Sequence, residues 1–240
     1  MSKMSLDSQT AVYRQQIEAS EPTLNIQTWE INREGLVNNA VIVNETHVFR
    51  FPKHEWAIDH LWQEANCLTL AHEHLDMPLP RWTVYDGEIV GTPFVGYEWI
   101  PGKPLQRFEI MQLSESDQDG LAEQLSTFLL QMHTIPVETV KEVKIGRSVT
   151  VRTQEDWLKM YETVQEKLFP HLMAFQKEWV HQHFAPVIES PAFIACEQTF
   201  INGDLGPYHL LYNPETRRLN GIIDFGTAGM GDPANDFAVC

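Results

Sequence analysis

Cysteine is scarce in this sequence, which contains three in 240 residues. Cys67, Cys196 and Cys240 lie far apart, and none belongs to a C-x-x-C pair of the kind that zinc ribbons and redox motifs use. Small disulfide-bonded domains carry an even number of closely spaced cysteines. Neither a disulfide framework nor a structural zinc site is therefore expected.

Long apolar runs are also missing. No stretch approaches the roughly 18 consecutive apolar residues that a membrane-spanning helix requires. The N-terminal segment 1–7 lacks the apolar core of a signal peptide. We therefore expect a protein that does not associate with membranes and that is located in the cytoplasm.

Basic residues are few relative to acidic ones, with 17 Lys and Arg against 33 Asp and Glu and a formal net charge of −16. A field of this sign repels nucleic acid and anionic membranes, and it attracts polycationic ligands. A nucleic-acid partner is therefore not expected. The content of 43% hydrophobic and 21% charged residues is typical of a globular protein with a sizeable core.

The first hundred residues have the pattern of a small sheet. Runs rich in β-branched and aromatic residues predict strands at 28–31, 40–43 and 47–51, with turn residues between them. Apolar residues at three- and four-residue steps then predict an amphipathic helix over 55–75. Two further strands are expected, at 81–85 and 94–100. The first domain is therefore predicted to be a nucleotide-binding lobe over residues 1–100.

The sequence Pro101-Gly102-Lys103-Pro104 interrupts this pattern, so a second domain is predicted over residues 101–240. This part is expected to be mainly helical up to residue 200. Ser116 is predicted to cap one helix, and Thr153 with Asp156 predicts a capping box at the start of another. Short strands are expected at 193–201 and 221–225. The predicted fold is α+β, with a cleft between two lobes as a natural nucleotide site.

The most informative chemical pattern lies near the C-terminal end. Asp204 follows an apolar run, His209 lies five residues later, and Asp224 precedes Phe225-Gly226 at the end of a strand-like segment. Phosphoryl transfer needs one carboxylate beside the attacking hydroxyl and further groups that hold Mg²⁺ against the nucleotide phosphates. Taken singly, Asp204 could cap a turn and His209 could be a packed core residue. In this order and together, they favour a magnesium-dependent phosphotransferase.

Residues 196–240 closely resemble the C-terminal core of aminoglycoside phosphotransferases and related antibiotic kinases. The segments Asn202–Asn213, Gly221–Gly226 and Gly231–Ala238 carry this resemblance. It implies the two-lobed protein-kinase-like fold of that family. In the family, helices that build the acceptor pocket follow the last segment, so the second lobe of this chain is expected to be incomplete.

The same resemblance implies that Asp204 is the catalytic base and that His209 and Asp224 hold magnesium. The family usually has Asn at the place of His209, and magnesium prefers oxygen ligands. A histidine there is similar to the 2″-phosphotransferase branch of the family. Two residues before the base the family usually has His, whereas this chain has Asn202, which we expect to shape the catalytic loop.

In the N-terminal half, the resemblance places Arg50 where the family has a strand lysine that contacts the α- and β-phosphates. Glu64 on the following helix is its expected partner. Arginine keeps the charge but presents a planar fork in place of a compact ammonium group. Lys53 is the alternative cation, and a solvated surface position is the alternative for Arg50 and Glu64.

Two further segments are expected to contact the nucleotide. The turn from Gly35 through Asn38 to Asn39 is predicted to cover the phosphates with backbone N–H groups. The segment 97–100 resembles the hinge of the family, so backbone groups near Glu98 and Ile100 are expected to bind the purine edge. An edge strand that simply ends at the following proline is the alternative.

The expected function is therefore transfer of the γ-phosphate of ATP or GTP to a hydroxyl of a polycationic small molecule, in the first place an aminoglycoside, with Mg²⁺ as cofactor. Kinases for macrolides, homoserine, choline or fructosamine share these motifs. A truncated nucleotide-binding fragment without catalysis is a further alternative. The sequence does not indicate the oligomeric state, but an incomplete lobe would expose apolar surface, which predicts low stability or self-association.

Overall fold

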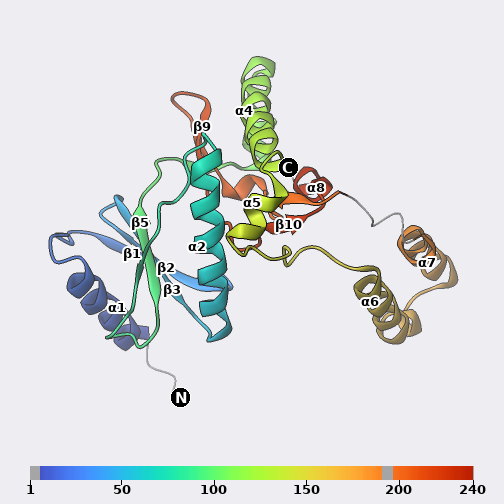
Figure 1. The fold of residues 1–240 in the computed structure, drawn as a ribbon, viewed down its shortest axis with the longest axis horizontal. Helices are drawn as coiled ribbons and strands as arrows, with labels where there is room; N and C mark the ends of the chain where they lie inside the picture. The colour runs from blue at the N-terminus through green and yellow to red at the C-terminus, as the bar shows by residue number, and fades with distance from the viewer. Residues whose placement is uncertain (1–5, 191–196, 240) are drawn as a thin grey trace.

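The computed structural model describes residues 6–190 and 197–239, and it consists of a sheet-containing part and a mixed, mainly helical part with α2 between them (Figure 1). The first part contains α1 (Leu6–Ser20), β1 (Trp29–Asn32), β2 (Asn38–Val43), β3 (His47–Pro52), α2 (Trp56–His74), β4 (Thr83–Tyr85) and β5 (Phe94–Glu98). The strands form one antiparallel sheet in the order β1-β2-β3-β5-β4. All five strands and helix α2 were predicted from the sequence.

The alternation of side chains along β2 gives the sheet two different faces. Val41 and Val43 are fully buried, whereas the residues between them are only half-buried. The buried face packs against α1, which contributes Tyr13 and Ile17 to a core with the phenylalanines of β3 and β5. The other face carries Ala40, whose register partner on β3 is Arg50. Arg50 therefore lies on the face away from α1.

Helix α1 was not predicted, since only one helix was expected in this lobe. Its apolar pattern is weak, because the buried side chains described on it are Tyr13, Ile17 and the polar Gln16. The Tyr13 ring stacks on Phe51 with 4.1 Å between centroids, and its hydroxyl accepts a hydrogen bond from the buried Asn39 side chain at 2.9 Å. Contact with the sheet thus fixes this helix.

The second part contains thirteen described elements. They are β6 (Lys103–Pro104), α3 (Arg107–Ile110), α4 (Glu115–His133), α5 (Val137–Glu142), α6 (Gln154–Lys167), η1 (Phe169–His171), α7 (Ala174–Glu189), β7 (Thr199–Ile201), η3 (Pro207–His209), β8 (Leu210–Asn213), β9 (Arg218–Ile222), β10 (Gly229–Gly231) and α8 (Ala234–Val239). Strands β6, β8 and β9 form one small sheet, and β7 pairs with β10. The predicted boundary after residue 100 falls between β5 and β6, and the division into two domains stays a prediction.

Three local predictions need comment. The cap of α4 is Ser114, whose hydroxyl accepts from the Asp117 N–H at 3.2 Å, so the prediction of Ser116 was wrong. Ser114 has the extended backbone of a cap, whereas Ser116 already lies in the first turn. The capping box of Thr153 and Asp156 at the start of α6 is confirmed.

The two short strands predicted near the chemical motif have other bounds than expected. Residues 199–201 form β7, and residues 193–196 of that prediction lie outside the described residues. The second strand, β9, ends at Ile222, because the backbone of Asp224 turns into the left-handed region with φ of 67°. This break places the Asp224 side chain on a loop.

The core of the second part includes one face of α2. Cys67, Leu68 and Ala71 on that face join a cluster with residues of α4, β8 and β9. Helices α6 and α7 pack against each other and lie apart from the rest of the chain in Figure 1. In the described parts of the chain, 6–190 and 197–239, no helix is long and apolar enough to span a membrane.

Candidate functional site

Hydrogen bonds between buried side chains and backbone groups hold the loop that follows β7. Asn202 is fully buried, and its side chain donates to the Asp224 carbonyl at 3.0 Å and accepts from the Asp204 N–H at 3.1 Å. Asn202 therefore connects the loop of Asp204 to the loop of Asp224. This contact supplies a physical reason for the loop-shaping role that the sequence suggested for Asn202.

Gly203 occupies a backbone conformation that favours glycine, with φ of 83°. A Cβ at this position would come within 2.8 Å of the Thr150 hydroxyl and 2.9 Å of the Ser148 hydroxyl. The glycine thus permits both the turn and the close approach of the segment 148–150. As a result, Asp204 projects from a loop with little freedom to move.

Asp236 on α8 accepts hydrogen bonds from the backbone of this loop, a role that the sequence did not suggest. Its fully buried carboxylate accepts from the Gly203 N–H at 2.7 Å and from the Asn202 N–H at 3.2 Å. The Nε2 atom of His133 lies 2.9 Å from the same carboxylate. The only sequence signal was the position of Asp236 within the segment Gly231–Ala238.

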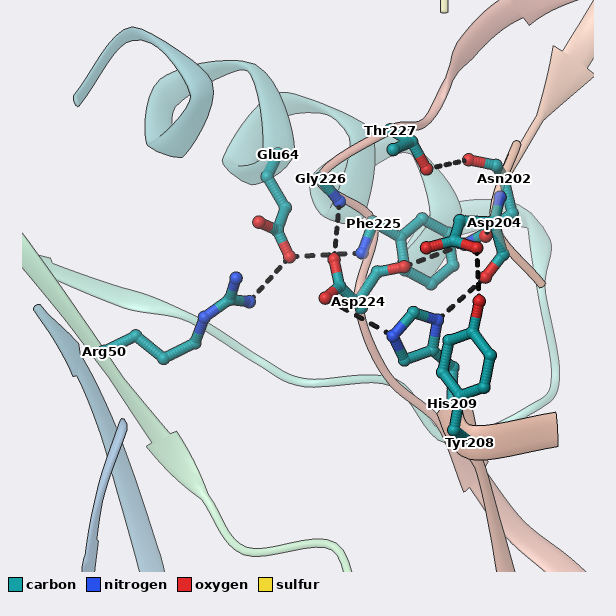
Figure 2. A network of polar contacts seen from close by, with 10 residues as sticks. All are labelled: Arg50, Glu64, Asn202, Asp204, Tyr208, His209, Asp224, Phe225, Gly226 and Thr227. Carbon is teal, nitrogen blue, oxygen red and sulfur yellow. Dashed lines mark hydrogen bonds and ion pairs between the residues drawn. The ribbon is translucent and has the colours of Figure 1, made fainter. Parts of the chain in front are cut away.

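The carboxylate of Asp204 is partly exposed and has a close neighbour that the sequence did not indicate. The Tyr208 hydroxyl donates a hydrogen bond to Asp204 Oδ1 at 2.7 Å (Figure 2). Tyr208 lies on the short turn η3, and this hydrogen bond, aided by burial, raises the pKa of the phenol. Asp204 is thus held by a neutral donor at one of its two oxygens.

His209 and Asp224 face each other across the site (Figure 2). The Nδ1 atom of His209 lies 2.8 Å from the Asp204 carbonyl oxygen, which can only accept, so Nδ1 carries a proton. In the neutral imidazole, Nε2 then presents a lone pair. It lies 3.5 Å from Asp224 Oδ2. A backbone carbonyl thereby fixes the orientation of the His209 ring, an arrangement that is also usual for histidines in metal sites.

The donor set at this place fits a magnesium ion that also binds phosphate oxygens. Magnesium is usually held by one or two protein ligands, together with waters and substrate phosphates. Asp224 is 43% exposed, and its Oδ1 accepts from the Gly226 N–H at 3.1 Å, which leaves Oδ2 directed toward His209. Within residues 6–190 and 197–239, no three His, Cys, Asp or Glu side chains gather as a metal site. A complete protein cage is thus not present in that part.

Arg50 on β3 and Glu64 on α2 form a buried ion pair with 2.8 Å between Nη1 and Oε1. Glu64 Oε1 also accepts from the Phe225 N–H at 3.1 Å, so α2 is tied to the loop after Asp224. Burial raises the pKa of Glu64, while Arg50 and the Phe225 N–H act against this effect. Burial also opposes the charge of Arg50, but Glu64 and Asp224 outweigh it and raise the pKa of the guanidinium.

The alternative cation, Lys53, is directed elsewhere. Its ammonium group donates to the carbonyl oxygens of Arg33 and Gly35, and it thereby supports the turn before β2. Arg50 lines the cavity next to Asp224, and Lys53 is not among the lining residues. The structure therefore favours Arg50 as the cation of the site.

These side chains meet in one cavity of about 570 Å³ between the sheet and the loops after β7 and β9. Its lining includes Asn38, Arg50, Glu64, Asp204, His209 and Asp224. Asn202 does not line the cavity; it is buried and joins the two loops through its hydrogen bonds. The structure thus brings together seven of the nine residues that the sequence proposed for the site.

The two hinge residues are placed differently. Glu98 and Ile100 line a second cavity of about 630 Å³, which also includes His47 and Arg81. Tyr97 lines both cavities. Glu98 and Ile100 therefore do not line the first cavity, and the expected contact of backbone groups near them with a purine stays a prediction.

The family model described as "phosphotransferase enzyme family" matches residues 28–240, which include every residue of this site. The chain belongs to that family. A GDP complex of aminoglycoside 2′-phosphotransferase-IIIa has a TM-score of 0.84 and 30% identity, with 95% of this chain and 76% of that chain covered. A GDP and kanamycin complex of APH(2″)-IIIa has a TM-score of 0.82 and 31% identity, with the same shares covered.

Curated proteins are similar to this chain at lower identity. Viomycin phosphotransferase of Streptomyces vinaceus is 25% identical over 204 residues, which are 82% of this chain and 68% of that protein. Acyl-CoA dehydrogenase family member 11 of Pongo abelii is 21% identical over 168 residues, or 68% of this chain. The chain spans about a fifth of the length of that relative. The predicted two-lobed kinase-like fold and the likeness to 2″-phosphotransferases are confirmed.

Proposed function

We propose that this protein transfers the γ-phosphate of ATP or GTP to a hydroxyl group of a small molecule, with aminoglycosides as the first acceptor class. The observation that carries this proposal is the meeting of Asp204, His209, Asp224 and the Arg50–Glu64 pair in one cavity. Each of these groups has a separate task in phosphoryl transfer. The family to which the chain belongs supports the reaction type.

Asp204 is proposed as the base that orients the acceptor hydroxyl and takes its proton. Its carboxylate lines the cavity, and its loop is fixed by Asn202 and Asp236. Most of the catalytic work in phosphoryl transfer is positioning and charge stabilisation, so a rigid loop matters more than a strongly basic group. Such a base contributes about 10²- to 10⁴-fold to the rate.

Asp224 and His209 are proposed to hold magnesium, which when bound would neutralise charge on the nucleotide phosphates. The lone pair on His209 Nε2 and the Asp224 carboxylate 3.5 Å away support this assignment. Arg50 is proposed to contact the α- and β-phosphates, because its buried guanidinium is fixed by Glu64 beside Asp224. Asn38 is proposed to cover the phosphates through the backbone of its turn.

The donor and acceptor are proposed from the solved relatives and from the charge of the chain. Structures with GDP and with kanamycin are similar to this chain over 95% of its length. A net charge of −16 would also draw a polycationic acceptor toward the protein. The expected location, the cytoplasm, and the absence of a nucleic-acid or membrane partner are part of the same proposal.

The decisive experiment measures phosphate transfer from ATP and GTP to a panel of aminoglycosides, with and without magnesium. Asp204→Ala is expected to reduce transfer by about 10²- to 10⁴-fold, whereas nucleotide affinity stays close to that of the parent chain. Asp86→Ala, in an exposed turn away from the cavity, is the matched control and should leave both quantities unchanged. Transfer that survives in Asp204→Ala would show that the base is wrongly assigned. Nucleotide binding without any transfer by the parent chain would favour the non-catalytic alternative.

A further inference from the structure

Tyr208 holds a place in the site that a substrate group would be expected to fill. Its hydroxyl donates to Asp204 Oδ1 at 2.7 Å, which is the usual length for a hydroxyl bound to a carboxylate. An acceptor alcohol oriented by Asp204 would make the same kind of hydrogen bond. The phenol is therefore a chemical equivalent of the acceptor hydroxyl, supplied by the chain itself.

We propose that Tyr208 is a placeholder that occupies Oδ1 of Asp204 until an acceptor arrives and so keeps water away from this oxygen. The proposal rests on the proposed function, because it concerns the same base. It makes Tyr208 a positioning residue that suppresses transfer of the phosphoryl group to water. Three independent features of the structure support it.

The first feature is the direction from which the phenol reaches the carboxylate. Asp204 lines the cavity assigned to the nucleotide, but Tyr208 is not among the residues that line it. The phenol thus reaches Asp204 without lining that cavity, and the contact is drawn in Figure 2. Since the nucleotide phosphates are proposed to lie in the cavity, an acceptor would reach Asp204 from the side on which the phenol lies.

The second feature is Gly206, which leaves room for the tyrosine ring. A Cβ at Gly206 would lie 2.5 Å from two ring carbons of Tyr208 and 2.8 Å from its hydroxyl. The backbone of Gly206, with φ of −74° and ψ of 159°, suits any residue. Glycine is therefore not needed for the turn, and the position of the ring is the physical reason for it.

The third feature is that Tyr208 is held loosely enough to be displaced. It is 51% exposed, and its ring contacts the His209 ring edge-on, with 4.5 Å between centroids. One hydrogen bond and the ring contacts with Gly206 and His209, on an exposed turn, can be exchanged for an acceptor at little cost. A buried tyrosine would instead have closed the site permanently.

The reaction that this placeholder prevents is hydrolysis of the nucleotide. In that reaction a water oxygen forms the bond to the γ-phosphorus, and the bond from that phosphorus to the nucleotide oxygen breaks. The water proton passes to Asp204 and then to solvent. A water molecule hydrogen-bonded to Asp204 is required, so a phenol in its place lowers the rate.

The test measures release of inorganic phosphate from Mg·ATP and Mg·GTP by the 240-residue chain without any acceptor. Tyr208→Phe removes only the hydroxyl and is expected to raise this rate about three- to tenfold, the effect of one lost hydrogen bond. Gly206→Ala, which displaces the ring, is expected to raise it as well. Nucleotide affinity should not change in either variant.

Two matched controls are available in the chain. Tyr161→Phe removes a phenol that contacts His181 at 2.9 Å on the exposed surface of α6. Gly120→Ala adds a Cβ that meets nothing within 4 Å on α4. Both controls should hydrolyse nucleotide at the parental rate. A general loss of structure would lower the rate, whereas the placeholder predicts an increase.

The outcomes separate this proposal from the proposed function. An unchanged or lower hydrolysis rate in Tyr208→Phe, with normal nucleotide binding and an intact effect of Asp204→Ala, would overturn the placeholder alone. Phosphate found covalently on Tyr208 by mass spectrometry would also overturn it, since the phenol would then be an acceptor. An increase that persists in the double variant with Asp204→Ala would also overturn the placeholder, because the extra hydrolysis would then not depend on Asp204. A parent chain that binds no nucleotide would overturn both proposals.

Discussion

At the scale of single residues, the site depends on a few buried polar groups that have satisfied partners. Asp236 is the clearest case, because its carboxylate accepts from the N–H groups of Asn202 and Gly203 and lies next to His133. A buried carboxylate without such donors would be costly. The loop of Asp204 is therefore stabilised by an acceptor that lies more than thirty residues later in the chain.

Replacing Asp236 by Asn tests this support. One acceptor oxygen becomes an NH₂ group, which cannot accept from the Gly203 or Asn202 N–H, so a buried donor is left unpaired. We expect a loss of about 1–3 kcal/mol in the free energy of unfolding and a lower transfer rate. Chemical denaturation and kinetic assays measure the two effects. Asp232→Asn is the control, since Asp232 only caps a turn at the Ala234 N–H and Asn caps equally well. Equal stability of the two variants would contradict the role of Asp236.

At the scale of elements, α2 connects the sheet to the loops of the second part. Its Glu64 binds Arg50 on one side and the Phe225 N–H on the other, and Cys67, one turn later, is fully buried with its sulfur 3.6 Å from the Ala228 carbonyl. Burial, and to a lesser degree the charge of Glu64, raises the pKa of the Cys67 thiol to about 12. The buried face of α2 therefore tolerates only a neutral thiol.

This raised pKa predicts a loss of stability at alkaline pH. Above about pH 9 the thiol ionises in the unfolded chain but keeps its proton in the folded one, so the unfolded state is favoured by about 1.4 kcal/mol per pH unit until the folded pKa is reached. Urea unfolding of the parent chain and of Cys67→Ala should be compared from about pH 8 to about pH 11. The difference in unfolding free energy should move in favour of Cys67→Ala as the pH rises. A difference that stays constant over this range would contradict the buried thiol.

At the scale of the whole molecule, two opposing forces act between copies of the chain. Helices α6 and α7 lie apart from the main body in Figure 1, and α7 exposes Phe175 and Trp179, which are 68% and 61% accessible and one turn apart. Adjacent exposed aromatic residues favour association. The net charge of −16 opposes it, because like charges repel.

We therefore predict that two copies associate through α7 and that salt strengthens the association. Raising the ionic strength from about 0.01 M to about 0.15 M shortens the screening length from about 30 Å to about 8 Å, which weakens repulsion and leaves apolar contact intact. Sedimentation velocity should show dimer increasing with salt and with protein concentration. The double change Phe175→Glu and Trp179→Glu should give monomer. Leu130→Glu on α4, at a residue 66% exposed, is the control. A parent chain that remains monomeric at both salt concentrations would refute the prediction.

The sequence by itself determined what depends on neighbours along the chain. Runs rich in β-branched and aromatic residues indicated the strands of the first sheet, and the Thr153–Asp156 pair indicated the start of α6. The order of Asp204, His209 and Asp224 indicated the reaction type, because these residues lie on loops that follow short strands. Such signals are local, so they can be read without knowing which distant segments meet.

Only the tertiary structure decided the contacts between distant segments. It placed Asp236 beneath the loop of Asp204, turned Lys53 away from the cavity and directed Arg50 into it. The contact of the Tyr208 hydroxyl with Asp204 is local, four residues apart, but it depends on the ring lying over Gly206, which the residue pattern did not indicate. The physical reason is that burial and hydrogen-bond satisfaction depend on which groups are close in space, whereas strand periodicity and helix caps depend on residues a few positions apart.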